Sequence, residues 1–226
     1  MSANWIDICN VAICYAGGQP IQSLRDSSEE ARKCNLMLPG VRQEILSLHP
    51  WNCATEWRIL GMIGESGKSG KPGWPYRYGF AQPENCLRVI RIESGLPTGS
   101  RATIASPGVP YITALFDSQR ILVCDEKAPT LVYIADAVSA STLTPALKSA
   151  LEFLLASRLA PPLSGGMQRA KTLADQYRIA LSEAILVDAR EEHGSIPRDD
   201  TYLRERGTTA PYYGIGDGLD PWGRQA

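Results

Sequence analysis

The spacing of hydrophobic positions predicts a short buried helix near the start of the chain. Residues 4–16 read NWIDICNVAICYA, and apolar residues recur there at steps of three and four: Ile6, Cys9, Ile13 and Ala16. Such spacing places side chains on one face of a helix. Gly17-Gly18 follows directly and ends the predicted helix.

A second helix is predicted over residues 27–49. Ser27 can cap its first turn, and Glu30 can return the hydrogen bond as a capping box. The apolar positions then advance by three and four residues in turn: Ala31, Cys34, Leu38, Val41, Ile45 and Leu48. Pro39 lacks a backbone N–H group, so we expect a bend near residues 35–39.

The pattern changes to that of strands between about residues 51 and 140. Runs rich in β-branched and aromatic residues alternate with loops rich in Gly, Pro and Ser; the runs are TEWRILGMI, CLRVIRIES, ALFDSQRILVCD and TLVYIADAV. This alternation predicts a small antiparallel β region inserted between helices. Asp117-Ser118-Gln119 lies between two apolar runs and is a candidate hairpin turn.

Helical spacing returns over residues 142–160 and 164–192. The first of these helices has Leu147, Leu151, Leu154 and Leu155 on one side, and Pro161-Pro162 is expected to end it. The second has an amphipathic stripe that consists of Ala170, Leu173, Ala174, Tyr177, Ala180, Leu181 and Ala184. The predicted fold is therefore α+β: a four-helix bundle with an inserted small antiparallel β region and an extended C-terminal arm.

The predicted domain covers residues 1–192, and the arm covers residues 193–226. The arm shows no sustained periodicity and has few aliphatic residues, but it contains aromatic residues of the types that anchor interfaces: Tyr202, Tyr212, Tyr213 and Trp222. We expect it to bind a partner and to become ordered on assembly. The alternative is a chain end without a role.

Composition and charge narrow the functional classes. The 226 residues have a formal net charge of -1, which gives no global basic field for general nucleic-acid binding. The six cysteines are scattered singly and there are only two histidines, so no zinc-ligand cluster is visible. The N-terminus lacks the features of a signal peptide and no run of eighteen apolar residues occurs, which predicts a cytosolic chain without membrane association.

Residues 61–69, GMIGESGKS, resemble a phosphate-binding loop but depart from its spacing. Gly67-Lys68-Ser69 is present, whereas the first glycine of the motif is required at position 62, which holds Met62. The following GKPGWP disfavours the helix that such a loop needs. We favour a surface loop, and nucleotide binding remains the alternative.

Few residues suggest catalysis. His49 and His193 lie at predicted helix ends and are interpreted as cations that stabilise those ends. Asp188, Glu191 and Glu192 are interpreted as the solvated end of a helix rather than a metal site or an acid–base pair. We predict no catalytic residue, no metal site and no cofactor.

An aromatic cluster in WPYRYGF is a candidate for partner binding. Trp74, Tyr76, Tyr78 and Phe80 surround Arg77, and such a cluster suits either a stacking platform for single-stranded nucleic acid or a strand that packs on a core or a partner. The second interpretation is preferred. The predicted partner-binding residues are therefore Tyr202, Tyr212, Tyr213, Trp222, Trp74, Tyr76 and Tyr78.

Four segments together resemble the tail tubular protein A family of phages and prophages, the head-to-tail adaptors of short-tailed virions. They are Ala16-Gly17-Gly18 with Pro20 to Leu24, the acidic helix with Glu29 to Arg32, Trp51 to Ala54, and PYRYGFAQPENCLRVIRI at residues 75–92. The likeness extends through the paired C-terminal helices to about residue 192 and covers roughly four fifths of the chain. The loop at 64–73 and the tail after His193 have no counterpart in the family pattern.

The resemblance implies a structural virion protein rather than an enzyme. Members of the family form a ring, commonly of twelve subunits, between the portal protein and a downstream tail or nozzle protein. Double-stranded viral DNA passes through the lumen without sequence-specific binding. The implied location is the head–tail junction of the virion, after assembly in the host cytoplasm. Two alternatives remain: a tail-completion or stopper protein, and a nucleotide-binding packaging factor that uses residues 61–69.

Overall fold

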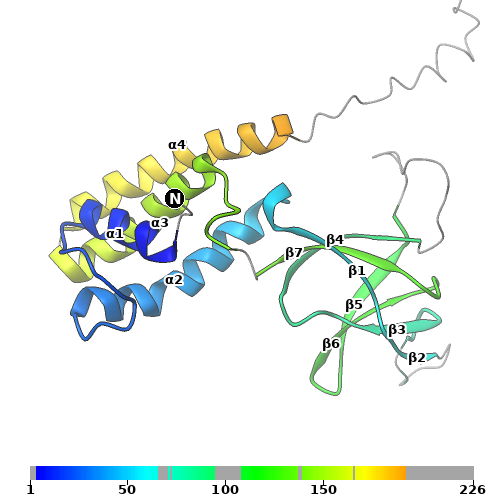
Figure 1. Ribbon diagram of the computed structural model, residues 1–226. Coiled ribbons are helices and arrows are strands. Elements are labelled where there is room, and N and C mark those ends of the chain that lie inside the picture. The colour runs from blue at the N-terminus through cyan, green and yellow to red at the C-terminus, as the bar shows by residue number, and fades with distance from the viewer. Residues whose placement is uncertain are drawn as a thin grey trace, which may run out of the picture. The chain divides into compact units, whose positions relative to one another are not determined.

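A computed structural model describes residues 4–65, 71, 73–94, 108–136, 139–164 and 166–191 (Figure 1). The elements in these ranges are four α-helices, one short 3-10 turn and seven strands. The helices are α1 (Trp5–Ala16), α2 (Glu29–Leu48), α3 (Pro145–Ser164) and α4 (Met167–Glu191). The predicted arm at 193–226 lies outside the described residues, as do four predicted partner-binding residues: Tyr202, Tyr212, Tyr213 and Trp222.

Local capping explains where the first two helices begin and end. Gly17 ends α1 with a φ of 89°, and its N–H donates to the carbonyl of Ile13 at 2.9 Å; the left-handed region favours glycine. The cap of α2 is Ser28 rather than the predicted Ser27, because the Ser28 hydroxyl accepts from the N–H of Ala31 at 3.3 Å.

Helix α3 continues through two prolines that were expected to end it. Pro161 and Pro162 lie inside its last turn. Two side chains bond carbonyl groups in the last turns: the Ser164 hydroxyl donates to the carbonyl of Ala160 at 3.0 Å, and the ammonium of Lys33 donates to the carbonyl of Pro162 at 2.6 Å. These two bonds satisfy carbonyl groups that helix ends leave without backbone partners.

Helix α3 is central to the helical part because it packs against each of the other three helices. Leu147, Leu151 and Leu155 of α3 are buried in a core shared with Ile13 of α1 and Ile45 of α2. Ile134 belongs to the same core although it comes from a strand. The helical part and one sheet are thus joined by a shared apolar contact.

The seven strands form two antiparallel sheets (Figure 1). The three-stranded sheet has the order β1-β7-β4, with β1 (Thr55–Ile59), β7 (Thr130–Ala135) and β4 (Cys86–Glu93). The four-stranded sheet has the order β2-β3-β6-β5, with β2 (Met62–Glu65), β3 (Tyr78–Ala81), β6 (Gln119–Cys124) and β5 (Tyr111–Phe116). Only Leu60-Gly61 separates β1 from β2, so one segment supplies an edge strand to each sheet.

The two sheets bury a second core between them. Phe80 and Leu122 of the four-stranded sheet and Leu131, Tyr133 and Ile92 of the three-stranded sheet are 0% exposed and belong to one cluster. The helical core does not include these residues. Each sheet therefore turns one face toward the other, as in a sandwich or an open barrel.

These two cores correct the predicted fold class. The fold is α+β, with four helices and two antiparallel sheets, and not a four-helix bundle with a small β insert. The physical reason is that seven strands present enough apolar surface to form a core of their own. The strand-rich segment is a principal part of the fold rather than an extension of the helices.

The β5–β6 hairpin turns where the sequence suggested, but its loop is one residue shorter than predicted. Asp117 and Ser118 form the loop with φ values of 47° and 65°, and Gln119 already pairs with Phe116 across the hairpin. Positive φ at both central residues is typical of the type I′ turn, whose twist matches that of the strands.

Candidate functional site

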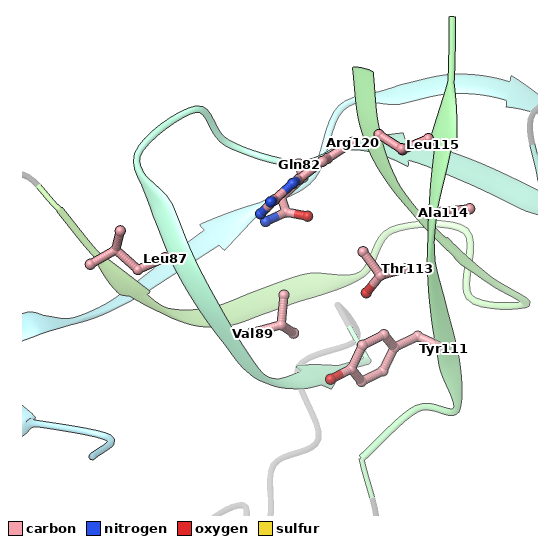
Figure 2. Close-up of a pocket in the computed structure, with 8 residues that line it drawn as sticks. All are labelled: Gln82, Leu87, Val89, Tyr111, Thr113, Ala114, Leu115 and Arg120. Atoms are coloured by element: carbon pink, nitrogen blue, oxygen red, sulfur yellow. The ribbon is translucent and has the colours of Figure 1, made fainter. Parts of the chain in front are cut away.

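A pocket lies between the free edges of the two sheets (Figure 2). β4 is the last strand of one sheet and β5 is the last strand of the other. The chain joins them at one end, where the N–H of Val109 donates to the carbonyl of Ile92 at 2.8 Å. The pocket has a volume of about 560 Å³ and is lined by Leu87, Val89, Tyr111, Thr113, Ala114, Leu115, Gln82 and Arg120. This volume lies within the range of ligand-binding pockets.

Strand register directs two lining residues, Val89 of β4 and Thr113 of β5, toward the inner core. Val89 lies opposite Tyr133, and Thr113 lies opposite Leu122. Residues opposite each other in antiparallel strands share a face of the sheet. Because Tyr133 and Leu122 are buried between the sheets, Val89 and Thr113 face the same interior. The pocket is therefore an opening into the space between the sheets.

Gln82 supplies a buried polar group without a hydrogen-bond partner. Its side chain is 9% exposed, and its Oε1 has no partner among the described residues. The backbone N–H of Gln82 donates to the carbonyl of Arg120 at 3.1 Å, which fixes the residue at this end of the pocket. Leaving a buried acceptor unpaired costs about 1–3 kcal/mol. Such an acceptor takes its hydrogen bond from a water molecule or from a bound donor.

Two further polar residues lie near Gln82: Arg120, which lines the pocket, and Cys86, which contacts Gln82. Burial raises the pKa of the Cys86 thiol, while a hydrogen bond with Gln82 and the positive charge of Arg120 act in the opposite direction. Figure 2 shows the side chains of Gln82 and Arg120 at the same end, with Leu87, Val89 and Tyr111 placed around the rest. The site thus combines apolar walls with one buried acceptor and one cation, which is suited to binding rather than to proton transfer.

Asp188 forms a second polar site, at the junction of α2, the 3-10 turn Asn52–Ala54 and α4. It is 1% exposed, and its carboxylate lies 3.2 Å from His49 Nε2 and accepts from the backbone N–H of Asn52 at 3.1 Å. The Asn52 side chain donates to the Asp188 carbonyl at 3.0 Å. This cluster corrects the interpretation of Asp188 as part of a solvated helix end.

The cluster around Asp188 is a structural joint and offers no activated nucleophile. The nearby thiol of Cys53 has its pKa raised by burial first and by the Asp188 charge second. A raised pKa keeps the thiol protonated, and the protonated thiol is a poor nucleophile. Glu191 is exposed, whereas Glu192 and His193 lie outside the described residues. The sequence signal for this joint is the run His49-Pro50-Trp51-Asn52 directly after a helix.

Of residues 61–69, positions 61–65 are described, and most of them form a strand. Met62–Glu65 is strand β2, and the next element after the loop is strand β3. A phosphate-binding loop requires a strand before it and a helix after it. Lys68 and Ser69 lie outside the described residues. No group of three or more His, Cys, Asp or Glu side chains in the described ranges could hold a metal ion.

The structure separates the predicted aromatic cluster into buried and exposed members. Tyr78 is 8% exposed and belongs to the core between the sheets, with its ring centroid 6.5 Å from that of Phe80. Tyr76 is partly buried, and Trp74 is 49% exposed. Of these three residues, only Trp74 is exposed. The pocket between β4 and β5 was missed because its residues come from separate runs with no common motif.

No protein-family model matches the chain, and no curated protein matches it. No helix within the described ranges has the length and hydrophobicity needed to span a membrane.

Proposed function

We propose that this chain is a structural subunit of a phage or prophage neck, the head-to-tail adaptor. Copies of the chain form a ring that joins the portal to the downstream tail protein and continues the DNA conduit. The proposal starts from the sequence resemblance, whose segments include Ala16-Gly17-Gly18 and Trp51 to Ala54. In this proposal the chain is not an enzyme.

The observation that carries the proposal is the set of large apolar side chains left exposed on both parts of the fold. On the helical part, Ile179 is 54% exposed and Leu186 is 58% exposed. On the strands, Trp57 is 60% exposed and Ile59 is 74% exposed, both on the edge strand β1. Exposed apolar groups that gather in this way mark interaction surfaces.

Helix α4 illustrates how such a surface supports ring formation. Its buried residues are Leu173, Ala180, Ala184 and Asp188. Ile179 and Leu186 are seven residues apart, so they fall on one face, nearly opposite those residues. A helix with a core-facing side and a second apolar side can pack against a neighbouring subunit. Repeated heterologous contacts form a ring when the rotation between subunits closes, and the proposed adaptor requires such closure.

The proposed conduit requires weak contact with DNA. Each Lys or Arg contact with phosphate adds salt-sensitive affinity and would slow the passage of DNA. The chain has 23 basic and 24 acidic residues, a balance that suits a passive lumen. The proposed partners are further copies of the chain, the portal and the tail protein, and the proposed location is the head–tail junction of the virion.

The test is assembly on the portal protein. The full chain, mixed with a phage portal protein, is expected to form a ring on one end of the portal, visible by negative-stain electron microscopy. Leu186→Asp and Ile179→Asp should reduce the fraction of decorated portals about tenfold, since each buries a charge at a contact. Gln176→Asp is the matched control because Gln176 is exposed on the same helix. Absence of any ring on the portal would refute the proposal.

A further inference from the structure

The pocket between β4 and β5 has a hydrogen-bonding requirement that narrows its ligand. Its buried unpaired atom, Gln82 Oε1, accepts a hydrogen bond and cannot donate one. Most of the remaining lining is apolar, including Leu87, Val89 and Leu115. A bulky apolar side chain that carries a donor matches this acceptor and the apolar part of the lining. The indole of tryptophan has this composition, since its Nε1–H donates and nothing on it accepts.

Two exposed indoles occur among the described residues. Trp57 is 60% exposed on β1, and Trp74 is 49% exposed in the turn before β3. Trp57 lies on an edge strand that has β7 on one side and no strand of its own sheet on the other. Native proteins usually protect such an edge with charge or proline. Here the edge strand carries the charged residues Glu56 and Arg58, but it also exposes Trp57 and Ile59, two large apolar side chains that another chain can contact.

Strand register shows that a chain cannot place Trp57 in its own pocket. Trp57 lies opposite Val132, whereas Val89 of the pocket lies opposite Tyr133. Val132 and Tyr133 are successive residues of β7, so they point to opposite faces of the sheet. Trp57 and Val89 thus point to opposite faces of the three-stranded sheet, and they lie on strands at its opposite edges. Any contact between them joins two copies, and it joins two different surfaces.

We propose that the pocket between β4 and β5 receives the Trp57 indole of a second copy of this chain, with the indole N–H donating to Gln82 Oε1. A contact between two different surfaces is heterologous, and its repetition gives a ring or an open filament. The inference rests on the proposed ring assembly and specifies one contact within it. Arg120 lines the same end of the pocket and has an exposed side chain.

The experiment measures self-association of the full chain, without portal, by sedimentation velocity over a range of concentrations. The variants are Trp57→Phe, which keeps an aromatic ring but has no donor, and Gln82→Met, which keeps the length but has no acceptor. Each should weaken association about tenfold, the effect of one buried hydrogen bond. The double variant should be no weaker than either single variant, because both remove the same bond.

Trp74→Phe is the matched control, since it removes a donor from the other exposed indole. It should change association by less than about twofold. Thermal melts check folding: Gln82→Met is expected to melt within a few degrees of wild type, because it removes both the unpaired buried acceptor and the hydrogen bond to Cys86, whose effects oppose each other.

Several results would overturn the inference. They are a wild-type chain that stays monomeric at about millimolar concentration, unchanged association in Trp57→Phe, additive losses in the double variant, or a loss in Trp74→Phe equal to that in Trp57→Phe. Rings on the portal that persist in Trp57→Phe would overturn this contact and leave the adaptor proposal intact. Non-additive losses of self-association in Trp57→Phe and Gln82→Met, together with the absence of any ring on the portal, would support this contact and overturn the adaptor proposal.

Discussion

At the scale of single residues, Asp188 shows how one buried carboxylate can join distant segments. It meets His49 and the backbone of Asn52, which are 139 and 136 residues away in the sequence. The indole of Trp51, between them, is fully buried and donates to the carbonyl of Ile45 at 2.9 Å. The end of α4 is thereby fixed to the segment that leaves α2 and enters the sheets.

Asp188→Ala should destabilise the chain by about 2–4 kcal/mol, because it leaves the Asn52 N–H and the His49 ring without their buried acceptor. Urea unfolding followed by circular dichroism measures the loss. Glu191→Ala, one turn later and exposed, is the control and should change stability by less than about 0.5 kcal/mol. Equal effects of the two variants would show that the joint contributes nothing.

Glu152 gives a pH-dependent prediction. Burial raises its pKa, and Lys148 opposes this only in part. Its ionised form therefore destabilises the fold at neutral pH, and this effect disappears as the pH falls below the unfolded value of about 4.5. Glu152→Gln should stabilise the chain by about 0.5 kcal/mol at pH 7 and by nothing near pH 4.

The control for Glu152 is Glu29, whose pKa is shifted in the opposite direction. A hydrogen bond and the charge of Lys33 lower the pKa of Glu29, so its ionised form favours the fold at neutral pH. Glu29→Gln should not raise the melting temperature at pH 7. Melting curves at pH 4, 5.5 and 7 compare the two variants, and a gain for Glu152→Gln that persists at pH 4 would contradict the assignment.

At the scale of elements, α3 organises the helical part and its apolar face should determine stability. Leu151 is 1% exposed in the shared core, so Leu151→Ala should lower the free energy of unfolding by about 2–5 kcal/mol. Leu173 lies on α4, which packs against α3, and is 8% exposed, so Leu173→Ala should lie at the lower end of that range. Leu36 on α2 is 78% exposed, and Leu36→Ala is the control. A thermal melt of Leu151→Ala that matches wild type would mean that its face is wrongly assigned.

At the scale of the whole molecule, the proposed roles fall on different parts of the chain. A chain that ends at Glu192 keeps every described helix and strand, so its melting temperature should stay within a few degrees of wild type. If residues 193–226 bind a partner, as their aromatic content predicts, the truncated chain should decorate portals at least tenfold less often. Full decoration by the truncated chain, counted in electron micrographs, would place the joint elsewhere.

Local sequence patterns predicted the helices well, because a helix is held by contacts between residues three and four apart. The helix expected at residues 27–49 runs over Glu29–Leu48, and the one expected at 4–16 runs over Trp5–Ala16. The N-cap of α2 was predicted one residue too early, since Ser27 and Ser28 are chemically alike and only the backbone conformation determines which of them caps the helix. The α3 terminus differed because Lys33, far away in sequence, contributes a bond there.

The sequence by itself thus determined where helices and strands form, because period and turn chemistry act over a few residues. Only the tertiary structure decided that the strands form two sheets with a core of their own, since the packing of Phe80 and Leu122 against Tyr133 depends on long-range pairing. It also decided the burial of Asp188 and the position of Gln82 between β4 and β5. These sites arise from segments whose meeting no local pattern encodes.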